Sequence, residues 1–223
     1  MKIDIASPHY CMICRFNACH DEFPICRECL SEFQDLISAK CKKCKKSAFS
    51  CKCHGEKAPR YLFTYSGSVA RNLIYYLKEN ADKRTVDFIA ELMVRACGIK
   101  TESFSAVTYG PRLKRKIRRA GYDQAKVLAE AISRIYNIPL ITALERLPGK
   151  KEQKLLSQSD RRKAAQFNFR SAEPLPEVKY KRLLLIDDVS TTGATIQACA
   201  KLIRNDYADS VVPLVIAKTP IIK

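Results

Sequence analysis

From about residue 60 onward, segments in which apolar residues recur at helical spacing alternate with short, almost unbroken apolar runs. Positions 69, 73, 74 and 77, for example, fall on one side of a helix. The same spacing predicts helices within 68–80, 87–99, 123–138 and 195–204. The apolar runs predict strands within 103–110, 182–187 and 209–219, and 140–147 fits either a strand or a short helix. Strands that alternate with helices favour an α/β domain with a mainly parallel sheet.

The first 58 residues follow neither pattern and are rich in cysteine and lysine instead. Nine of the eleven cysteines lie between positions 11 and 53, in three Cys-x2-Cys pairs, a closing Cys-x-Cys and one extra residue, Cys19. The opening residues lack the layout of a secretory signal, so we expect reduced thiols rather than disulfides. Two Cys-x2-Cys pairs together supply the four tetrahedral ligands of a structural zinc ion.

The order of these pairs predicts where zinc would bind. One zinc ion would use Cys11, Cys14, Cys26 and Cys29. A second would use Cys41, Cys44, Cys51 and either Cys53 or His54. The sequence also allows a zinc ion to be held by two cysteine pairs that are not neighbours in the chain. It does not decide between one zinc ion and two. The other two cysteines, Cys97 and Cys199, fall in apolar helical patterns, where we expect buried core thiols.

The charge of the chain favours a polyanionic partner. Lysine and arginine number 40 against 23 aspartate and glutamate residues, which gives a formal net charge of +17. The charge is concentrated in residues 111–120, PRLKRKIRRA, where six of ten residues are basic and none is acidic. We expect this run to contact nucleic acid through Arg115, Lys116, Arg118 and Arg119. The chain has no run of 18 apolar residues, so we expect a cytoplasmic protein that reaches the inner face of a membrane only through its partners.

The tract KRLLLIDDVSTTGAT, residues 181–195, carries the strongest chemical signal. If its apolar part is a central parallel strand, Asp187 and Asp188 fall at the carboxyl end, where open α/β sheets bind ligands. Residues 189–195 would then form a hydroxyl-rich loop at a helix N-terminus, which attracts phosphate through its free N–H groups and the helix dipole. Adjacent carboxylates suit the vicinal hydroxyls of a sugar. The tract therefore predicts a site for a ribose 5-phosphate.

This tract resembles the phosphoribosyl pyrophosphate motif of type I phosphoribosyltransferases, an apolar strand followed by two acids and a T-T-G-x-T loop. The chain as a whole is similar to the ComF family of competence proteins, which join a zinc-ribbon module to that domain. The resemblance is carried by the cysteine pairs and by YSGSVARNLIYYLK, PRLKRKIRRAGYDQAKVLA and QKLLSQSDRRKAAQFNF, residues 65–78, 111–129 and 153–169. The chain departs from the family at Ala120, at Ala164 and at Tyr109-Gly110, which weakens the case for catalysis at that surface.

The resemblance implies a fold and a set of site residues. It implies a zinc-binding, double-zinc-ribbon-like domain over 1–58 and a phosphoribosyltransferase-like domain over 59–223, a mainly parallel sheet flanked by helices. The residues that would bind phosphoribosyl pyrophosphate with Mg²⁺ fall into three groups. Asp187 and Asp188 would hold the ribose hydroxyls, with Asp188 also acting at C1. The 5-phosphate would contact Ser190, Thr191, Thr192, Gly193, Ala194 and Thr195, and the pyrophosphate Lys78, Arg112 and Arg118.

Three functions are compatible with the sequence. We favour a competence protein that handles incoming single-stranded DNA in natural transformation, with the phosphoribosyl pocket as a ligand site, in contact with other DNA-uptake or recombination proteins. The candidate residues for stacking on bases are Tyr75, Tyr76, Tyr122 and Phe169. The first alternative is an active Mg²⁺-dependent phosphoribosyltransferase on an unknown acceptor. The second is a scaffold whose zinc module and pocket dock protein partners.

Overall fold

The computed structural model describes residues 9–19, 23–40, 44–47, 58–80, 82–148 and 168–220. Several sequence predictions lie outside these ranges. Four candidate ligands of the second zinc site, Cys41, Cys51, Cys53 and His54, are among them, as are residues 153–167 of the third motif. The boundary between domains at residues 58 and 59 stays a prediction.

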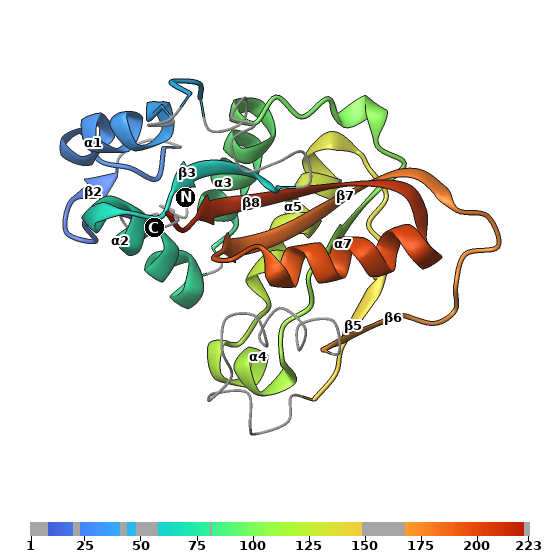
Figure 1. The fold of residues 1–223 in the computed structure, drawn as a ribbon. Helices are drawn as coiled ribbons and strands as arrows, with labels where there is room; N and C mark the ends of the chain where they lie inside the picture. The colour runs from blue at the N-terminus through green and yellow to red at the C-terminus, as the bar shows by residue number, and fades with distance from the viewer. Residues whose placement is uncertain are drawn as a thin grey trace, which may run out of the picture.

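A parallel sheet of four strands, in the order β3-β8-β7-β4, forms the centre of the molecule (Figure 1). The strands are β3 (Arg60–Thr64), β8 (Ala208–Lys218), β7 (Tyr180–Ser190) and β4 (Ala106–Tyr109). The two central strands pair in parallel from Tyr180 opposite Ala208 to Ser190 opposite Lys218. The mainly parallel α/β fold expected from the alternating pattern is confirmed.

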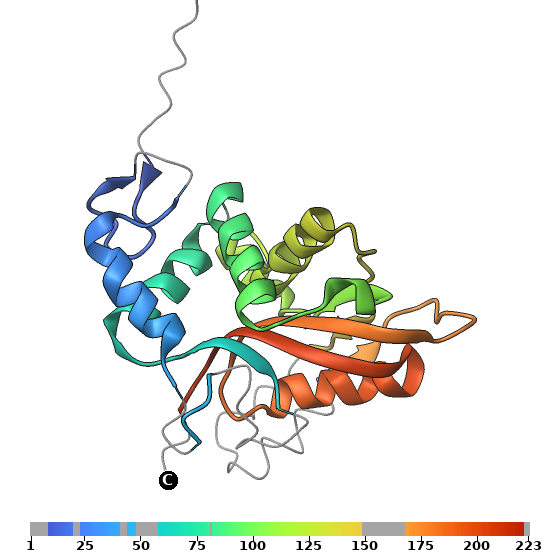
Figure 2. The same ribbon diagram turned by 90° about the horizontal axis from the view of Figure 1, so that it is seen from above.

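Helices cover both faces of this sheet, which explains why its central strands are apolar without interruption. The helices α2 (Gly67–Glu79), α3 (Lys83–Ala96) and α5 (Gln124–Tyr136) lie on one face, and α7 (Ala194–Asp206) lies on the other (Figure 2). Successive side chains of a strand point to opposite faces. Accordingly, Leu184 packs in the core cluster with the first three helices, whereas Leu183 and Leu185 pack in the cluster with α7.

Local signals set the ends of these helices. Asp82 precedes α3, and its carboxylate accepts a hydrogen bond from the N–H of Thr85 at 2.9 Å. Asp123 precedes α5 in the same way and accepts from the N–H of Ala125 at 3.1 Å. Gly193 precedes α7 with φ of +78°, a conformation that glycine adopts without strain. Because Asp82 caps α3, the helix predicted over 87–99 begins four residues earlier, at Lys83.

Three smaller elements border the sheet. The basic run forms a short helix, α4 (Lys114–Ala120), and a single 3-10 turn covers Thr101–Ser103. The strands β5 (Leu144–Arg146) and β6 (Phe169–Ser171) pair antiparallel as a separate ribbon. The segment 140–147, which fitted a strand or a helix, thus contains a strand.

The N-terminal module consists of β1 (His9–Tyr10), β2 (Ala18–Cys19) and α1 (Arg27–Ser38), and it packs against α2 and α3. The ring of Phe23 meets that of Phe88 edge to face, with centroids 4.8 Å apart. Arg84 on α3 donates to the carbonyl of Phe23 at 2.7 Å. Within the part of the chain that the structure describes, no helix is long and apolar enough to cross a membrane.

Candidate functional site

A cleft of about 430 Å³ opens at the carboxyl edge of the sheet, beside the ends of β7 and β4. Asp187 and Asp188 lie along it, and so does the segment from Gly110 to Leu113 that follows β4. Thr191, Thr195 and Thr219 complete the sheet side. Open α/β sheets bind their ligands at this edge. Side chains far apart in the sequence therefore meet where the tract at 181–195 predicted a site.

The two adjacent carboxylates are held by the strand that carries them. The N–H of Asp188 donates to the carboxylate of Asp187 at 2.9 Å, and the N–H of Val189 donates to that of Asp188 at 2.6 Å. Burial, followed by the neighbouring charge of Asp188, raises the pKa of Asp187 well above its usual range. Two carboxyl groups kept this close are costly without a ligand, and they offer several acceptor atoms to one that carries hydroxyls or a cation.

The hydroxyl-rich loop is shorter than the sequence predicted. The predicted loop covered residues 189–195, but β7 continues through Ser190 and α7 begins at Ala194. The reason is that β8 extends far enough to pair with this end of β7, with Val189 opposite Ala217 and Ser190 opposite Lys218. The true connection is residues 191–193.

The short loop nevertheless has the features of an anion cradle. Gly193 has no side chain with which to cap the N-terminus of α7, and within the described residues the buried Ser190 hydroxyl has no hydrogen-bond partner. A Cβ at Gly193 would lie 4.0 Å from that hydroxyl oxygen, an ordinary contact, so the positive φ rather than lack of space favours glycine here. Thr191 and Thr195 line the cleft, and the Thr192 hydroxyl accepts from the N–H of Ala194 at 3.3 Å. An anion would satisfy the buried hydroxyl.

Four cationic side chains line the cleft, two of them predicted for pyrophosphate. Lys78 and Arg112 were predicted there, whereas Arg118, the third candidate, lies exposed on α4 outside the cleft lining. The backbone N–H of Arg112 donates to Asp123 at 2.8 Å, and its guanidinium donates to the Gln124 side chain. Arg112 is therefore fixed in place at the start of the basic run.

The other two cations are Lys116 and Arg146. Lys116, predicted to contact nucleic acid, is exposed on α4 and also lines the cleft. Burial and then the charges of Arg112 and Arg146 lower its pKa. Arg146 was missed, since a single arginine after a short apolar run carries no signal. Its guanidinium carbon lies 4.3 Å from the ring centroid of buried Phe169, and its buried Nε has no hydrogen-bond partner among the described residues. The remaining four cations of the basic run, Lys114, Arg115, Arg118 and Arg119, are exposed.

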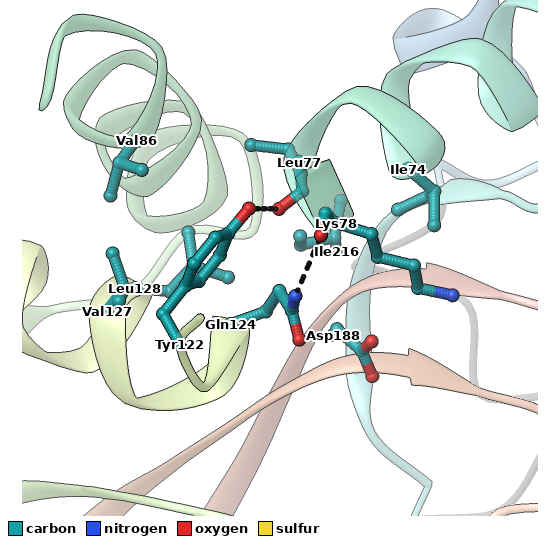
Figure 3. A pocket seen from close by; sticks show the side chains of 10 residues that line it. All are labelled: Ile74, Leu77, Lys78, Val86, Tyr122, Gln124, Val127, Leu128, Asp188 and Ile216. Atoms are coloured by element: carbon teal, nitrogen blue, oxygen red, sulfur yellow. Dashed lines mark hydrogen bonds between the residues drawn. The ribbon is translucent and has the colours of Figure 1, made fainter. Parts of the chain in front are cut away.

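A small apolar cavity of about 10 Å³ lies behind Asp188, between α2, α3 and α5 (Figure 3). Tyr122 closes it and donates its hydroxyl to the carbonyl of Leu77 at 2.8 Å. Gln124 donates to the carbonyl of Lys78 at 3.4 Å, so the end of α2 is tied to the start of α5. The cavity has room for one water molecule at most, so it is not a ligand site.

The N-terminal module brings four predicted zinc ligands together. The sulfur atoms of Cys11, Cys14, Cys26 and Cys29 all lie within 4.8 Å of one another. Those of Cys14 and Cys26 are 3.9 Å apart, close to the roughly 3.8 Å between sulfurs of a tetrahedral zinc site. The N–H of Ile13 donates to the Cys11 sulfur at 3.4 Å, which suits a thiolate. The cluster fits one structural zinc ion.

The other cysteines and the candidate stacking residues lie in different surroundings. Cys97 and Cys199 are buried core thiols, as predicted. Phe169 is buried, and Tyr76 and Tyr122 are partly buried with their hydroxyls donated to Asp82 and to Leu77. Tyr75 is the exception, because 53% of it is exposed. Of the predicted stacking residues, Tyr75 alone presents its ring to solvent.

The chain was compared with known proteins by sequence and by structure. No protein-family model matches the chain. It is 39% identical to Competence protein F of Haemophilus influenzae over 87 residues, which cover 39% of this chain and 38% of that protein. It is 26% identical over 209 residues to Competence protein ComFC of Streptococcus pneumoniae, and this match covers 86% of each chain. The solved structure of adenine phosphoribosyltransferase from Leishmania tarentolae aligns at 18% identity over 62% of this chain and 58% of that one. Its TM-score of 0.38 is too low to support an argument.

Proposed function

We propose that this protein, a member of the ComF family of competence proteins, handles incoming single-stranded DNA and binds phosphoribosyl pyrophosphate in its cleft. One observation carries the proposal. The adjacent acids and four cationic side chains line one cleft at the carboxyl edge of the sheet, and the buried Ser190 hydroxyl follows the acids at the end of the same strand. On this proposal the protein acts on the cytoplasmic side, where the strand is passed to other DNA-uptake or recombination proteins.

The cleft residues divide naturally among the parts of the ligand. Asp187 and Asp188 would accept hydrogen bonds from the ribose hydroxyls. The N–H groups at the start of α7, with the hydroxyls of Ser190, Thr191 and Thr195, would hold the 5-phosphate. The pyrophosphate would contact Lys78 and Arg112, joined by Lys116 or Arg146 in place of Arg118. Mg²⁺, when bound with the ligand, would supply positive charge between the pyrophosphate and the acids.

The surface of α4 supports the DNA-handling part of the proposal. Arg115, Arg118 and Arg119 project from a short helix into solvent, and no acidic residue lies within it. Gly121 ends the helix at φ of +84°, so the next residues turn back toward the core. Contacts to phosphates by such cations are sequence-independent and release bound counterions.

The test replaces Arg115, Lys116, Arg118 and Arg119 with alanine and measures the affinity for a single-stranded oligonucleotide at several salt concentrations. We expect a loss of at least about tenfold, and a slope of log K against log salt that is shallower by about 3, because each phosphate contact contributes about 0.7. The matched control replaces Lys126, Lys179, Lys181 and Lys201, which are exposed elsewhere and remove the same charge. Equal losses in the two variants, or an unchanged affinity, would contradict the proposal.

The acidic pair beside the cradle favours one second candidate, an active phosphoribosyltransferase on an unknown acceptor. Its test is release of pyrophosphate from phosphoribosyl pyrophosphate with Mg²⁺, measured across a panel of nucleobases and amines. Release that requires both an added acceptor and Asp188 would establish turnover. Release no faster than in buffer with every member of the panel would leave the cleft as a binding site.

A further inference from the structure

Exposed aromatic side chains gather at the N-terminal module and the helix beside it. Among the described residues, the large apolar side chains that are exposed include Tyr10, Phe16, Phe23 and Tyr75. Phe16 is the extreme case, with 85% of its surface exposed. Single exposed apolar residues need no explanation, but several aromatic rings in one region mark an interaction surface.

The zinc cluster fixes the position of this surface. Arg15 and Phe16 follow directly after the ligand Cys14, in the turn of the first cysteine pair. Arg15 has φ of +61°, and its N–H donates to the carbonyl of Cys11 at 2.8 Å. A left-handed conformation in a non-glycine residue is kept only where the surroundings dictate it. The turn therefore fixes the backbone that carries Arg15 and Phe16 beside the metal ligands.

Arg15 connects the turn to α2. Its guanidinium carbon lies 4.5 Å from the ring centroid of Tyr75, and 5.8 Å from that of Tyr76. The same side chain makes an exposed ion pair with Glu79 at 3.4 Å. An exposed pair of this kind contributes little, so a phosphate could replace the carboxylate. Arg15 thus joins Tyr75 to the turn that carries the exposed Phe16, and we name these three residues the knuckle surface.

The charges around the knuckle surface favour nucleic acid over a protein partner. Arg71 is exposed four residues before Tyr75 on the same side of α2, and Lys78 follows three residues after it, toward the cleft. Aromatic rings interleaved with cations are the surface on which bases of a single strand stack. The cores of protein interfaces are instead depleted of charge. The chain also carries a net charge of +17.

We propose that the knuckle surface is a base-stacking site for single-stranded DNA, in which Phe16 and Tyr75 stack on bases and Arg15 lies between them. The site is separate from the phosphate-binding cations of α4. This inference rests on the proposed DNA-handling function, and it adds where and how the bases are held.

The test uses the full-length, zinc-loaded protein and a single-stranded oligonucleotide that contains 2-aminopurine, whose fluorescence reports stacking. We expect Phe16→Ala and Tyr75→Ala each to weaken binding about tenfold, since stacking on one base is worth a loss of that order. The slope against salt should not change, because no phosphate contact is removed. Phe16→Tyr keeps a ring and should keep the affinity. The matched control is Val178→Ala, an apolar residue that is 82% exposed in the segment between β6 and β7.

The outcomes separate this inference from the function on which it rests. If wild type does not bind the oligonucleotide, both are wrong. If wild type binds and the α4 variant loses affinity while Phe16→Ala and Tyr75→Ala do not, the stacking site alone is wrong. If Phe16→Tyr loses as much affinity as Phe16→Ala, stacking is also contradicted. The same holds if the alanine variants give a shallower slope of log K against log salt. Zinc content and melting temperature equal to wild type show that each variant is folded.

Discussion

At the scale of single residues, the cleft holds groups that the folded protein does not satisfy by itself. Asp187 is kept against Asp188 with a raised pKa, and the buried Ser190 hydroxyl has no hydrogen-bond partner in the part of the chain that the structure describes. Such costs are typical of ligand sites. The sequence motif was sufficient to find these residues because they are adjacent in the chain. It could not predict that Arg146 and Lys116 line the cleft, because both depend on where distant segments pack.

Asp187→Asn provides the test at this scale. Since the pKa of Asp187 is higher in the folded protein, the folded state binds more protons than the unfolded state, and wild type loses stability as pH rises above about 4. Asparagine does not titrate, so we expect Asp187→Asn to melt a few degrees above wild type at pH 7 and to lose this advantage toward pH 4. Melting curves at both pH values measure it, with the exposed Asp209→Asn as control. A variant less stable than wild type at pH 7 would show that the carboxylate is not strained.

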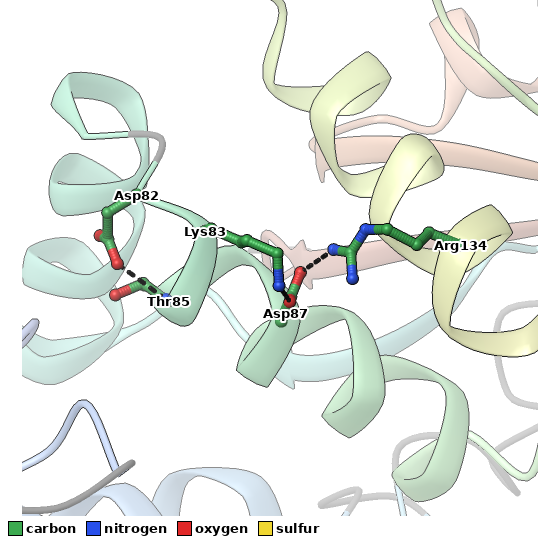
Figure 4. A network of polar contacts seen from close by, with 5 residues as sticks. All are labelled: Asp82, Lys83, Thr85, Asp87 and Arg134. Carbon is green, nitrogen blue, oxygen red and sulfur yellow. Dashed lines mark hydrogen bonds and ion pairs between the residues drawn. The ribbon is translucent and has the colours of Figure 1, made fainter.

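At the scale of elements, periodicity predicted the four long helices well, whereas α1 and α4 were missed. In α4 only Ile117 and the final Ala120 are apolar, so no helical period is visible. The amphipathic pattern of α1 was hidden among cysteines. The predicted start of α3 was four residues too late, although a capping aspartate precedes the helix. Asp82 caps it, and Asp87 accepts from Lys83 at 2.8 Å and pairs with Arg134 of α5 (Figure 4).

The cap of α3 gives the prediction for this scale. Asp82 accepts from the N–H of Thr85 and also from the hydroxyl of Tyr76 at 3.2 Å, so it joins α2 to α3. We expect Asp82→Ala to lower the free energy of unfolding by about 1 kcal/mol, the usual value of a helix cap. Asp82→Asn keeps a capping oxygen and should lose much less. Urea denaturation of wild type, Asp82→Ala and Asp82→Asn measures the free energies of unfolding. Equal losses in the two variants would mean that the charge of Asp82 matters rather than its capping oxygen.

At the scale of the whole molecule, the alternation of elements was enough to predict an α/β fold, but not the order of the strands. The position of the cysteine-rich module was not predictable either. It depends on contacts such as Phe23 and Phe33 against Phe88, which join residues more than fifty positions apart. The two apolar rings and the Arg15 contacts fix the module on α2 and α3.

Removal of zinc tests this arrangement. Cys26→Ser should lower the zinc content by one ion per chain and lower the melting temperature, because the loosened module uncovers Phe88 on α3. The matched control is Cys97→Ser, a buried cysteine far from the cluster, which should change the stability but not the zinc content. Zinc content unchanged by Cys26→Ser would show that the four sulfur atoms do not form a metal site.

The most direct test of the account is calorimetric titration of phosphoribosyl pyrophosphate with Mg²⁺ into wild type and into Asp188→Ala. We expect wild type to bind one ligand per chain and Asp188→Ala to bind it at least about tenfold more weakly. The reason is that a buried polar contact to the ligand is worth more than about 1.4 kcal/mol. Asp209→Ala, exposed on β8, should bind as wild type does. No binding to wild type, or equal binding to Asp188→Ala, would contradict the claim that this cleft holds a phosphorylated sugar.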